Sequence, residues 1–207
     1  MSEITLITGG CRSGKSRYAR RAAEDRGEKR LFIATAPILD DEMRHRVARH
    51  RAERHKQGWD TWEEQYDLAD RLRQLDPRSA PASKGGSRYD VVLCDCLTLW
   101  VNNLLFASKD DASLEEDEMA VRAFDLCAAA RAIPAPVFLV TNEVGLGIVP
   151  ADKISRQFRD LAGRCNQEVA AVADSVILMV SGLPVPLKGS LKETNFCPSS
   201  SSRMNRI

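Results

Sequence analysis

Short runs of apolar residues alternate along the chain with longer segments in which apolar residues recur at helical spacing. The apolar runs predict buried strands at residues 4–8, 30–35, 89–95, 136–141 and 175–180. The intervening segments predict helices at residues 16–24, 40–57, 68–75, 97–107, 114–132 and 152–173. Strands that alternate with helices are typical of a mostly parallel sheet with helices on both faces. The sequence therefore predicts an α/β fold.

The pattern also predicts a single domain over residues 1–188, followed by a polar tail over residues 189–207. A chain of 207 residues fits one domain of ordinary size. The segment Pro77 to Arg88 is rich in Pro, Ser and Gly, which indicates a loop inside the domain. After Lys188 the composition becomes polar, with serine at every position from 199 to 202, and we expect this tail to be flexible.

Composition excludes several classes of protein. The chain has 30 basic and 29 acidic side chains, so no global field favours nucleic acid or an anionic membrane surface. No apolar stretch reaches the roughly 18 residues of a membrane span, and the N-terminus lacks the features of a signal peptide. The six cysteines form no CxxC pair, and Cys94 and Cys96 stand in an apolar run, which indicates buried thiols. We expect a cytoplasmic protein without a membrane or nucleic-acid partner.

A complete phosphate-binding motif, G-x-x-x-x-G-K-[ST], follows the first predicted strand and precedes the first predicted helix. Its glycines let backbone N–H groups point inward at phosphate oxygens, and the helix N-terminus adds partial positive charge. We expect the ammonium to reach the β- and γ-phosphates and the last hydroxyl to bind Mg²⁺, with GTP or ATP as the nucleotide. The motif consists of Gly9, Gly10, Cys11, Arg12, Ser13, Gly14, Lys15 and Ser16.

An acidic residue, Asp95, ends the third predicted strand. An acid at the carboxyl end of a buried strand is where a Mg²⁺-orienting group lies in phosphate-loop proteins. The alternative is an N-cap for the helix that begins beside it. The phosphate loop favours the metal role without excluding the cap. A switch-type GTPase would need Asn-Lys-x-Asp after a late strand, and residues 141–144 read Thr-Asn-Glu-Val instead. A small-molecule kinase, an ATPase motor or a nucleotidyltransferase remains.

Three histidines, His45, His50 and His55, lie five residues apart on one predicted helix. Each step turns about 140°, so they cannot share a helix face, and a zinc site is disfavoured. Arginines flank His50 on both sides, and such cations favour a neutral, nucleophilic imidazole and would also bind nucleotide phosphates. Attack of that imidazole on an α-phosphorus is therefore permitted. The residues alone favour the simpler interpretation, a basic helix face in water.

Several further motifs occur in a fixed order. With them, the chain from about Ile4 to Lys188 resembles the bifunctional adenosylcobinamide kinase / adenosylcobinamide-phosphate guanylyltransferase family of cobalamin biosynthesis. The motifs are the phosphate loop with Thr8, Ile33-Ala34-Thr35-Ala36, Asp41-Glu42-Met43, His50-Arg51-x-x-Arg54, Trp59-x-Thr61-x-Glu63, residues 95–100 (DCLTLW), Asn103-Leu104-Leu105, residues 141–150 (TNEVGLGIVP) and residues 158–167 (FRDLAGRCNQ).

The resemblance implies a P-loop fold and two reactions. A nucleoside triphosphate first phosphorylates the aminopropanol hydroxyl of adenosylcobinamide, and GMP is then moved from GTP to that phosphate through a guanylylated histidine, which matches His50. The resemblance also implies a homotrimer. The implied nucleotide contacts are Gly9 to Ser16, Ala34, Thr35, Ala36, Arg51, Ala52, Glu53, Arg54, Glu63 and Asp95, with Mg²⁺ at Ser16 and Asp95.

Two other functions were weighed. A phosphate-loop kinase or ATPase without a covalent intermediate would leave His50 idle. A nucleic-acid-binding module could use the basic helix from Arg44 to Lys56, but with its acidic residues the segment from residue 40 nets only +2. No aromatic side chains interleave with the cations for base stacking, which disfavours this alternative.

Overall fold

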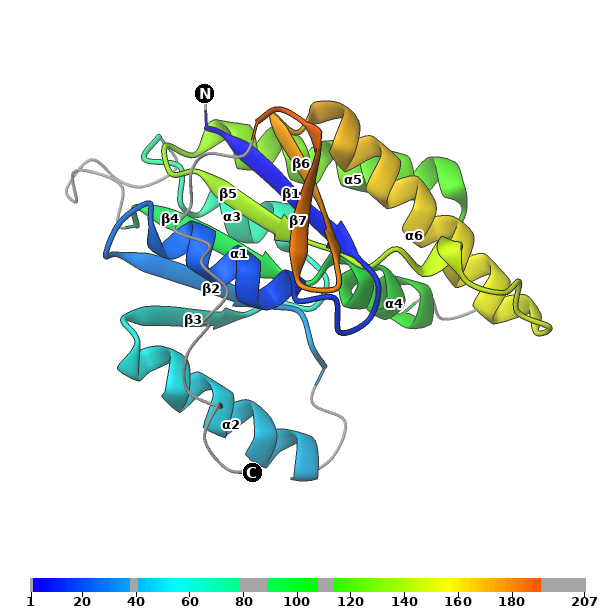
Figure 1. Ribbon diagram of the computed structural model, residues 1–207, viewed down its shortest axis with the longest axis horizontal. Coiled ribbons are helices and arrows are strands. Elements are labelled where there is room, and N and C mark those ends of the chain that lie inside the picture. Colours follow the sequence, from blue (N-terminus) through cyan, green and yellow to red (C-terminus); the bar gives the residue numbers. More distant parts are fainter. Residues whose placement is uncertain (1, 38–40, 79–88, 108–113, 191–207) are drawn as a thin grey trace, which may run out of the picture.

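The computed structural model describes residues 2–37, 41–78, 89–107 and 114–190 (Figure 1). Their strands form one seven-stranded sheet in the order β3-β2-β4-β5-β1-β6-β7. Every neighbouring pair is parallel except β6 and β7. The strands are β1 (Ile4–Gly9), β2 (Arg30–Ala34), β3 (Trp59–Glu63), β4 (Val91–Asp95), β5 (Val137–Val140), β6 (Ser175–Val180) and β7 (Leu183–Lys188).

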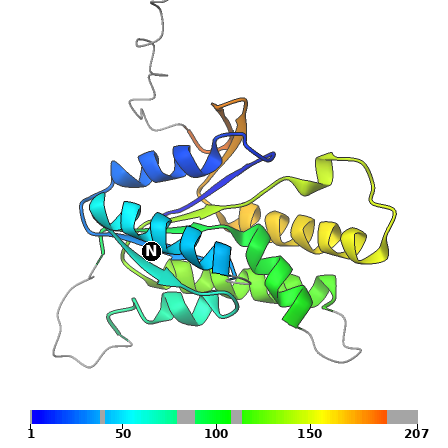
Figure 2. The same cartoon turned by 90° about the horizontal axis from the view of Figure 1, so that it is seen from below.

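Helices cover both faces of this sheet. They are α1 (Lys15–Glu24), α2 (Asp41–Lys56), α3 (Leu68–Arg73), α4 (Leu97–Ala107), α5 (Glu116–Ala132) and α6 (Lys153–Val172), with a short 3₁₀ helix, η1 (Val144–Leu146). Figure 2 shows the sheet with α1 on one side and α4, α5 and α6 on the other. The predicted phosphate-loop α/β fold, a mostly parallel sheet flanked by helices, is confirmed.

The two faces of the sheet bury separate cores because successive side chains of a strand point to opposite faces. On one face Ile7, Leu93 and Val140 pack with α1. On the other face Leu6 and Leu139 pack with α3, α4, α5 and α6. A parallel sheet covered on both faces needs strands that are apolar at nearly every position, which explains the continuous apolar runs in the sequence.

Two strands were not expected from the sequence, and both lie at edges of the sheet. Residues 59–63 (WDTWE) form β3, which pairs only with β2 and is half polar. The strand β7 pairs antiparallel with β6 and carries Pro184 and Pro186. Proline has no N–H to donate to a ladder, and a strand with a neighbour on one side only tolerates it. The helix α2 lies beyond β3, outside this edge (Figure 1).

Other predicted boundaries differ by one or two residues: α1 begins at Lys15 and α5 at Glu116. Residues 79–88 of the predicted loop and 191–207 of the predicted tail lie outside the described residues. The thiols of Cys94 and Cys96 are buried, as predicted. Within the described ranges, no helix is both long and apolar enough to cross a bilayer.

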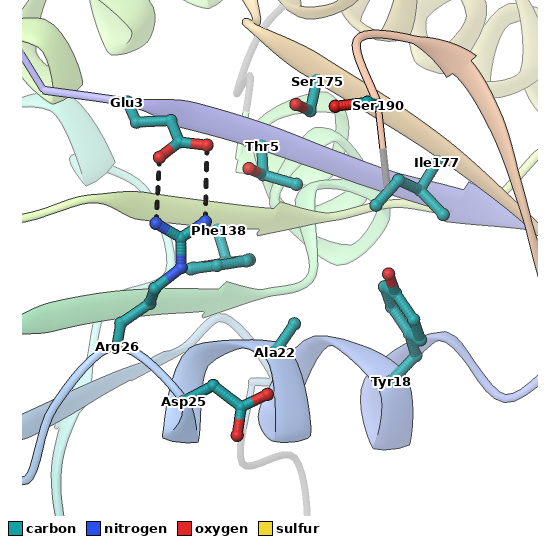
Figure 3. A pocket seen from close by; sticks show the side chains of 10 residues that line it. All are labelled: Glu3, Thr5, Tyr18, Ala22, Asp25, Arg26, Phe138, Ser175, Ile177 and Ser190. Carbon is teal, nitrogen blue, oxygen red and sulfur yellow. Dashed lines mark hydrogen bonds and ion pairs between the residues drawn. The ribbon is translucent and has the colours of Figure 1, made fainter. Parts of the chain in front are cut away.

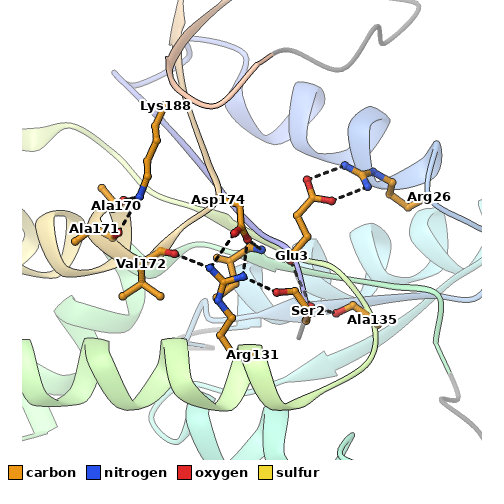
Figure 4. A network of polar contacts seen from close by, with 11 residues as sticks. Ser2, Glu3, Arg26, Arg131, Ala135, Ala170, Ala171, Val172, Asp174 and Lys188 are labelled. Carbon is orange, nitrogen blue, oxygen red and sulfur yellow. Dashed lines mark hydrogen bonds and ion pairs between the residues drawn. The ribbon is translucent and has the colours of Figure 1, made fainter.

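Polar contacts join the chain at the amino end of the sheet (Figure 4). The Arg131 guanidinium donates to the Ser2 carbonyl at 2.6 Å, to the Val172 carbonyl at 2.7 Å and to both carboxylate oxygens of Asp174. The Asp174 carboxylate also accepts from the Ile4 N–H at 2.7 Å. One side chain of α5 thus holds the start of β1 and the turn between α6 and β6. Its hydrogen bonds lower the pKa of Asp174.

Arg131→Ala should lower the free energy of unfolding by about 1–2 kcal/mol near neutral pH, because it removes charge-assisted hydrogen bonds from a partly exposed site. A carboxyl whose pKa is lowered in the folded state contributes stability above its unfolded pKa, and loses that contribution as the pH falls. The difference from wild type in denaturant unfolding should therefore shrink below about pH 4.

The matched control is Arg122→Ala, which removes an exposed pair with Glu118 on the same helix, at 2.8 Å. This change should cost about 0.3–0.5 kcal/mol. Equal losses in the two variants, or a loss at Arg131 that does not depend on pH, would contradict the role given to Arg131.

Candidate active site

The predicted site residues lie where five neighbouring strands end. We call this end of the sheet, formed by the carboxyl ends of its strands, the carboxyl edge. In the register of the ladders, Ala34 pairs with both Glu63 of β3 and Asp95 of β4. Asp95 in turn pairs with Val140 at the end of β5, and Val140 pairs with Ile7 of β1, shortly before the phosphate loop. Parallel pairing thus places residues that are far apart in the sequence at the same level of the sheet.

Backbone geometry explains two glycines of the phosphate loop. Gly9 has φ of 148°, and a Cβ there would lie 2.5 Å from the Met179 carbonyl oxygen, so no other residue fits. Gly14 has φ of 96°, in the left-handed region, and directly precedes α1. The Ser13 carbonyl accepts from the Gly182 N–H at 3.0 Å, which ties the loop to the turn between β6 and β7.

The loop has groups that fit a phosphate. Among the described residues, no side chain caps the N-terminus of α1, so its first N–H groups are available to a ligand. The hydroxyl oxygen of Ser13 is buried and has no hydrogen-bond partner within the described part of the chain. A buried polar atom without a partner is uncommon in proteins and is satisfied when a bound anion accepts from it.

The Lys15 side chain is buried behind this loop, with 7% of the residue exposed. Its ammonium donates to the Gly10 carbonyl at 2.7 Å. Burial lowers the pKa of Lys15, and the nearby Asp95 carboxylate acts in the opposite direction. A desolvated ammonium is strongly attracted to any anion that enters the loop.

Asp95 lies close to the phosphate loop, because the Ser16 hydroxyl and the Lys15 ammonium both act on the pKa of its carboxyl group. Burial raises the pKa of Asp95, while Ser16, Lys15 and Arg54 act in the opposite direction. The carbonyl of the following residue, Cys96, accepts the first hydrogen bond of α4, from the Trp100 N–H at 3.2 Å. Cys96 therefore occupies the N-cap position of α4, and the Asp95 side chain points to Ser16.

The side chains of Ser16 and Asp95 suit Mg²⁺, because both offer the oxygen ligands that this ion prefers. No group of three or more His, Cys, Asp or Glu side chains suited to a metal ion occurs in the part of the chain that the structure describes. Ser16 and Asp95 would therefore hold the ion together with oxygens of the nucleotide.

The segment after β2 is fixed by hydrogen bonds to the start of α4. The Thr35 hydroxyl donates to the Cys96 carbonyl and accepts from the Cys96 N–H, both at 2.8 Å. The Thr35 carbonyl accepts from the Asn103 amide at 2.8 Å. Thr35 is fully buried, whereas Ala34 and Ala36 on either side of it are partly accessible.

Arginines from α2 reach the same edge. The Arg54 guanidinium stacks 4.2 Å from the centre of the Phe32 ring and donates to the Thr61 hydroxyl at 3.1 Å. Arg51 pairs with Glu63 at 4.0 Å. Two positive charges therefore lie near the ends of β2 and β3, where they can bind an anionic ligand.

Other residues of α2 are not gathered there. Ala52 and Glu53 are exposed, and Glu53 pairs with Arg49 at 4.0 Å on the helix surface. His45 and His55 are also exposed. His50 lies on α2, but its side chain is outside the described part of the structure, so its role stays a prediction.

The sequence analysis missed one carboxylate at this edge, Glu143, which follows β5. Its backbone N–H donates to the Gly9 carbonyl at 3.1 Å, and its carboxylate accepts from the Thr8 hydroxyl and from the Asn166 amide at 3.3 Å. The available signal was an acidic residue three positions after a buried strand, inside the family motif at residues 141–150.

Comparison with known proteins agrees with this geometry. The model of the CobU family, cobinamide kinase / cobinamide phosphate guanyltransferase, matches residues 5–187. The chain belongs to this family. The match includes the phosphate loop, Asp95 and the segment that carries Glu143.

Three relatives from bacteria are similar over nearly their whole length. The bifunctional adenosylcobalamin biosynthesis protein CobU of Escherichia coli (strain K12) is 42% identical over 193 residues, and that of Salmonella typhimurium is 45% identical over 192 residues; each alignment covers 89% of this chain and 99% of the relative. The CobP protein of Pseudomonas aeruginosa is 42% identical over 184 residues, covering 89% of this chain and 96% of the relative.

A solved structure titled "The Structure Of A DnaB-Like Replicative Helicase And Its Interactions With Primase" aligns with 85% of this chain and 46% of that chain, at 15% identity and a TM-score of 0.47. A similarity at that level supports no argument about the fold. The fold class follows instead from the strand order and the phosphate loop.

A separate pocket of about 280 Å³ lies between α1 and the sheet. Figure 3 shows Tyr18 and Ala22 of α1 facing Thr5 and Ile177 of the sheet. The lining of this pocket includes none of the predicted site residues. We therefore keep the candidate active site at the carboxyl edge.

Asp95→Asn should leave the unfolding free energy unchanged or raise it near pH 7, because burial disfavours the ionised carboxyl. A carboxyl whose pKa is raised in the folded state contributes stability below its unfolded value of about 4, and that contribution is lost as the pH rises through the folded pKa. The variant should therefore gain stability relative to wild type as the pH rises from about 4 to 7. Melting curves across this range measure the effect.

The same variant should need more Mg²⁺ for nucleotide binding, as titration calorimetry would measure. A lowered melting temperature with unchanged Mg²⁺ dependence would instead indicate that Asp95 has only a structural role.

Proposed function

We propose that the protein phosphorylates adenosylcobinamide with a nucleoside triphosphate and then transfers GMP from GTP to the product, releasing pyrophosphate. The family match over residues 5–187 carries this proposal. The phosphate loop, with its buried ammonium, supports it because both reactions need a bound triphosphate.

In the kinase reaction, the chain positions the triphosphate and neutralises its charge. The loop N–H groups bind phosphate oxygens, and Lys15 leaves its contact with Gly10 to bind the β- and γ-phosphates. Ser16 and Asp95 would hold Mg²⁺, which when bound withdraws charge from the phosphoryl group. Arg51 and Arg54 are near enough to the same edge to bind further anionic groups.

In the guanylyl transfer, His50 is the proposed nucleophile. A neutral ring nitrogen attacks the α-phosphorus of GTP, and the bond from that phosphorus to the pyrophosphate oxygen breaks. A phosphate oxygen of the cobinamide phosphate then attacks the same phosphorus, and the phosphorus–nitrogen bond breaks to free His50. The family resemblance supports this role, because His50 matches the histidine that is guanylylated in the family.

The same proposal includes a homotrimer, as the family resemblance implies, and a location in the cytoplasm, as the cysteine content predicts. ATP and GTP both remain candidate donors for the kinase reaction.

His50→Ala should abolish the covalent GMP adduct and guanylyl transfer, while phosphorylation of adenosylcobinamide stays measurable. Phosphoryl transfer to a hydroxyl needs positioning and charge neutralisation, whereas transfer through an enzyme intermediate needs a nucleophile. Mass spectrometry of the protein after incubation with GTP and Mg²⁺ measures the adduct, and peptide mapping locates it.

The controls are His45→Ala and His55→Ala, which change exposed histidines on the same helix and should keep the adduct. Labelling that persists without His50 would refute the assignment. A wild-type protein that phosphorylates the substrate but never forms an adduct would favour a phosphate-loop kinase without a covalent intermediate.

A further inference from the structure

The residues that follow β5 lie between the two groups expected to hold the reacting end of the triphosphate. The sheet order places β5 between β4, which ends at Asp95, and β1, which leads into the phosphate loop. Val140 pairs with Asp95 on one side and with Ile7 on the other. Residues 141–143 therefore continue along the carboxyl edge at the centre of the candidate active site.

Of these three residues, only Glu143 offers an ionisable side chain. The Thr141 side chain is buried and donates to the Asn166 amide oxygen at 2.7 Å. The Asn142 backbone N–H donates to the Thr98 hydroxyl at 2.7 Å, which fixes the course of the segment. Glu143 is half-buried, and its backbone N–H is held by the Gly9 carbonyl at 3.1 Å.

The contacts of Glu143 orient its carboxylate and leave one oxygen available. Oε1 accepts from the Thr8 hydroxyl and from the Asn166 amide at 3.3 Å. The amide of Asn166 is itself held by the Thr141 hydroxyl and the Asn142 carbonyl. Oε2 accepts no hydrogen bond from a described residue. A carboxylate that is rigid at one oxygen and unoccupied at the other is suited to accept a proton.

The two other carboxylates at the strand ends are already engaged. Asp95 lies beside Ser16, the other proposed Mg²⁺ ligand, and beside the Lys15 ammonium. Glu63 pairs with Arg51 and lies beyond β2, at the far side of the edge from the phosphate loop. Glu143 is therefore the carboxylate best placed to serve the phosphoryl acceptor.

We propose that Glu143 is the general base of the kinase reaction; the proposal rests on the proposed function. The O–H bond of the substrate's aminopropanol hydroxyl breaks, and its proton goes to Oε2 of Glu143. The hydroxyl oxygen forms a bond to the γ-phosphorus. The bond from that phosphorus to the bridging oxygen breaks, and its electron pair leaves with the nucleoside diphosphate. Glu143 then releases the proton to water.

Glu143→Gln tests this role because glutamine keeps an oxygen that can accept from Thr8 and Asn166 but cannot take up a proton. The kcat for phosphorylation of adenosylcobinamide should fall about 100-fold or more, with KM for the nucleotide changed less than about threefold. Formation of the GMP adduct, and transfer of GMP to cobinamide phosphate supplied ready-made, should stay near wild-type rates.

A second variant, Glu143→Asp, distinguishes a general base from a residue with a purely structural role. If the role is structural, glutamine should replace Glu143 better than aspartate does, because glutamine has the right length. If Glu143 is a base, aspartate should replace it better, because aspartate keeps the carboxylate. We expect the aspartate variant to phosphorylate at least about tenfold faster than the glutamine variant. Glu118→Gln, the same change at an exposed residue of α5, is the control and should leave both reactions unchanged.

A glutamine variant within about threefold of wild type in phosphorylation, or one faster than the aspartate variant, would overturn the assignment. Equal loss of both reactions together with weakened nucleotide binding would also overturn it, because that result indicates a purely structural role for Glu143. A wild-type protein that does not phosphorylate adenosylcobinamide would instead refute the proposed function, so the two failures are distinguishable.

Discussion

In-register parallel pairing of five strands determines where the chemistry lies. It sets the ends of β3, β2, β4, β5 and β1 along one edge, so that the phosphate loop, Asp95 and Glu143 become neighbours. Charged groups are buried at this carboxyl edge, and burial disfavours the ionised forms of both Lys15 and Asp95. Ser13 adds a buried hydroxyl without a partner in the described chain. In the proposed function, binding of a magnesium nucleotide would offset these unfavourable features, which would link local instability to ligand affinity.

Much of the fold follows from local sequence signals, and the exceptions have physical reasons. The five strands buried on both faces show as apolar runs, and the glycines of the phosphate loop mark the turn into α1. The strand β3 was not predicted because only Trp59 and Trp62 of its five residues are apolar. A strand at the side of a sheet is exposed enough to carry the other, polar residues. The strand β7 was missed because Pro184 and Pro186 argue against a strand, and only its edge position tolerates them.

The site was predicted where its residues end strands or form a contiguous motif. Asp95 and the phosphate loop could be located in this way. The residues themselves raised His50 and Arg51 as candidates, and the family resemblance added Glu63 and the guanylylated-histidine role of His50. The family motif at residues 141–150 contains Glu143, but its importance could not be judged without the strand order, which places β5 between β4 and β1. The proximity of Asp95 to Ser16 also depends on packing, because the two residues are far apart in the sequence.

One nucleotide site serving both reactions is the central claim, and Lys15→Ala tests it most directly. In the proposed function, the buried ammonium is the point charge that neutralises phosphate oxygens in both reactions. Initial rates of cobinamide phosphorylation and of guanylyl transfer to cobinamide phosphate should both fall by about 100-fold or more in the variant, with its fold retained. A folded Lys15→Ala protein that keeps near-normal guanylyl transfer would contradict the claim and require a second nucleotide site.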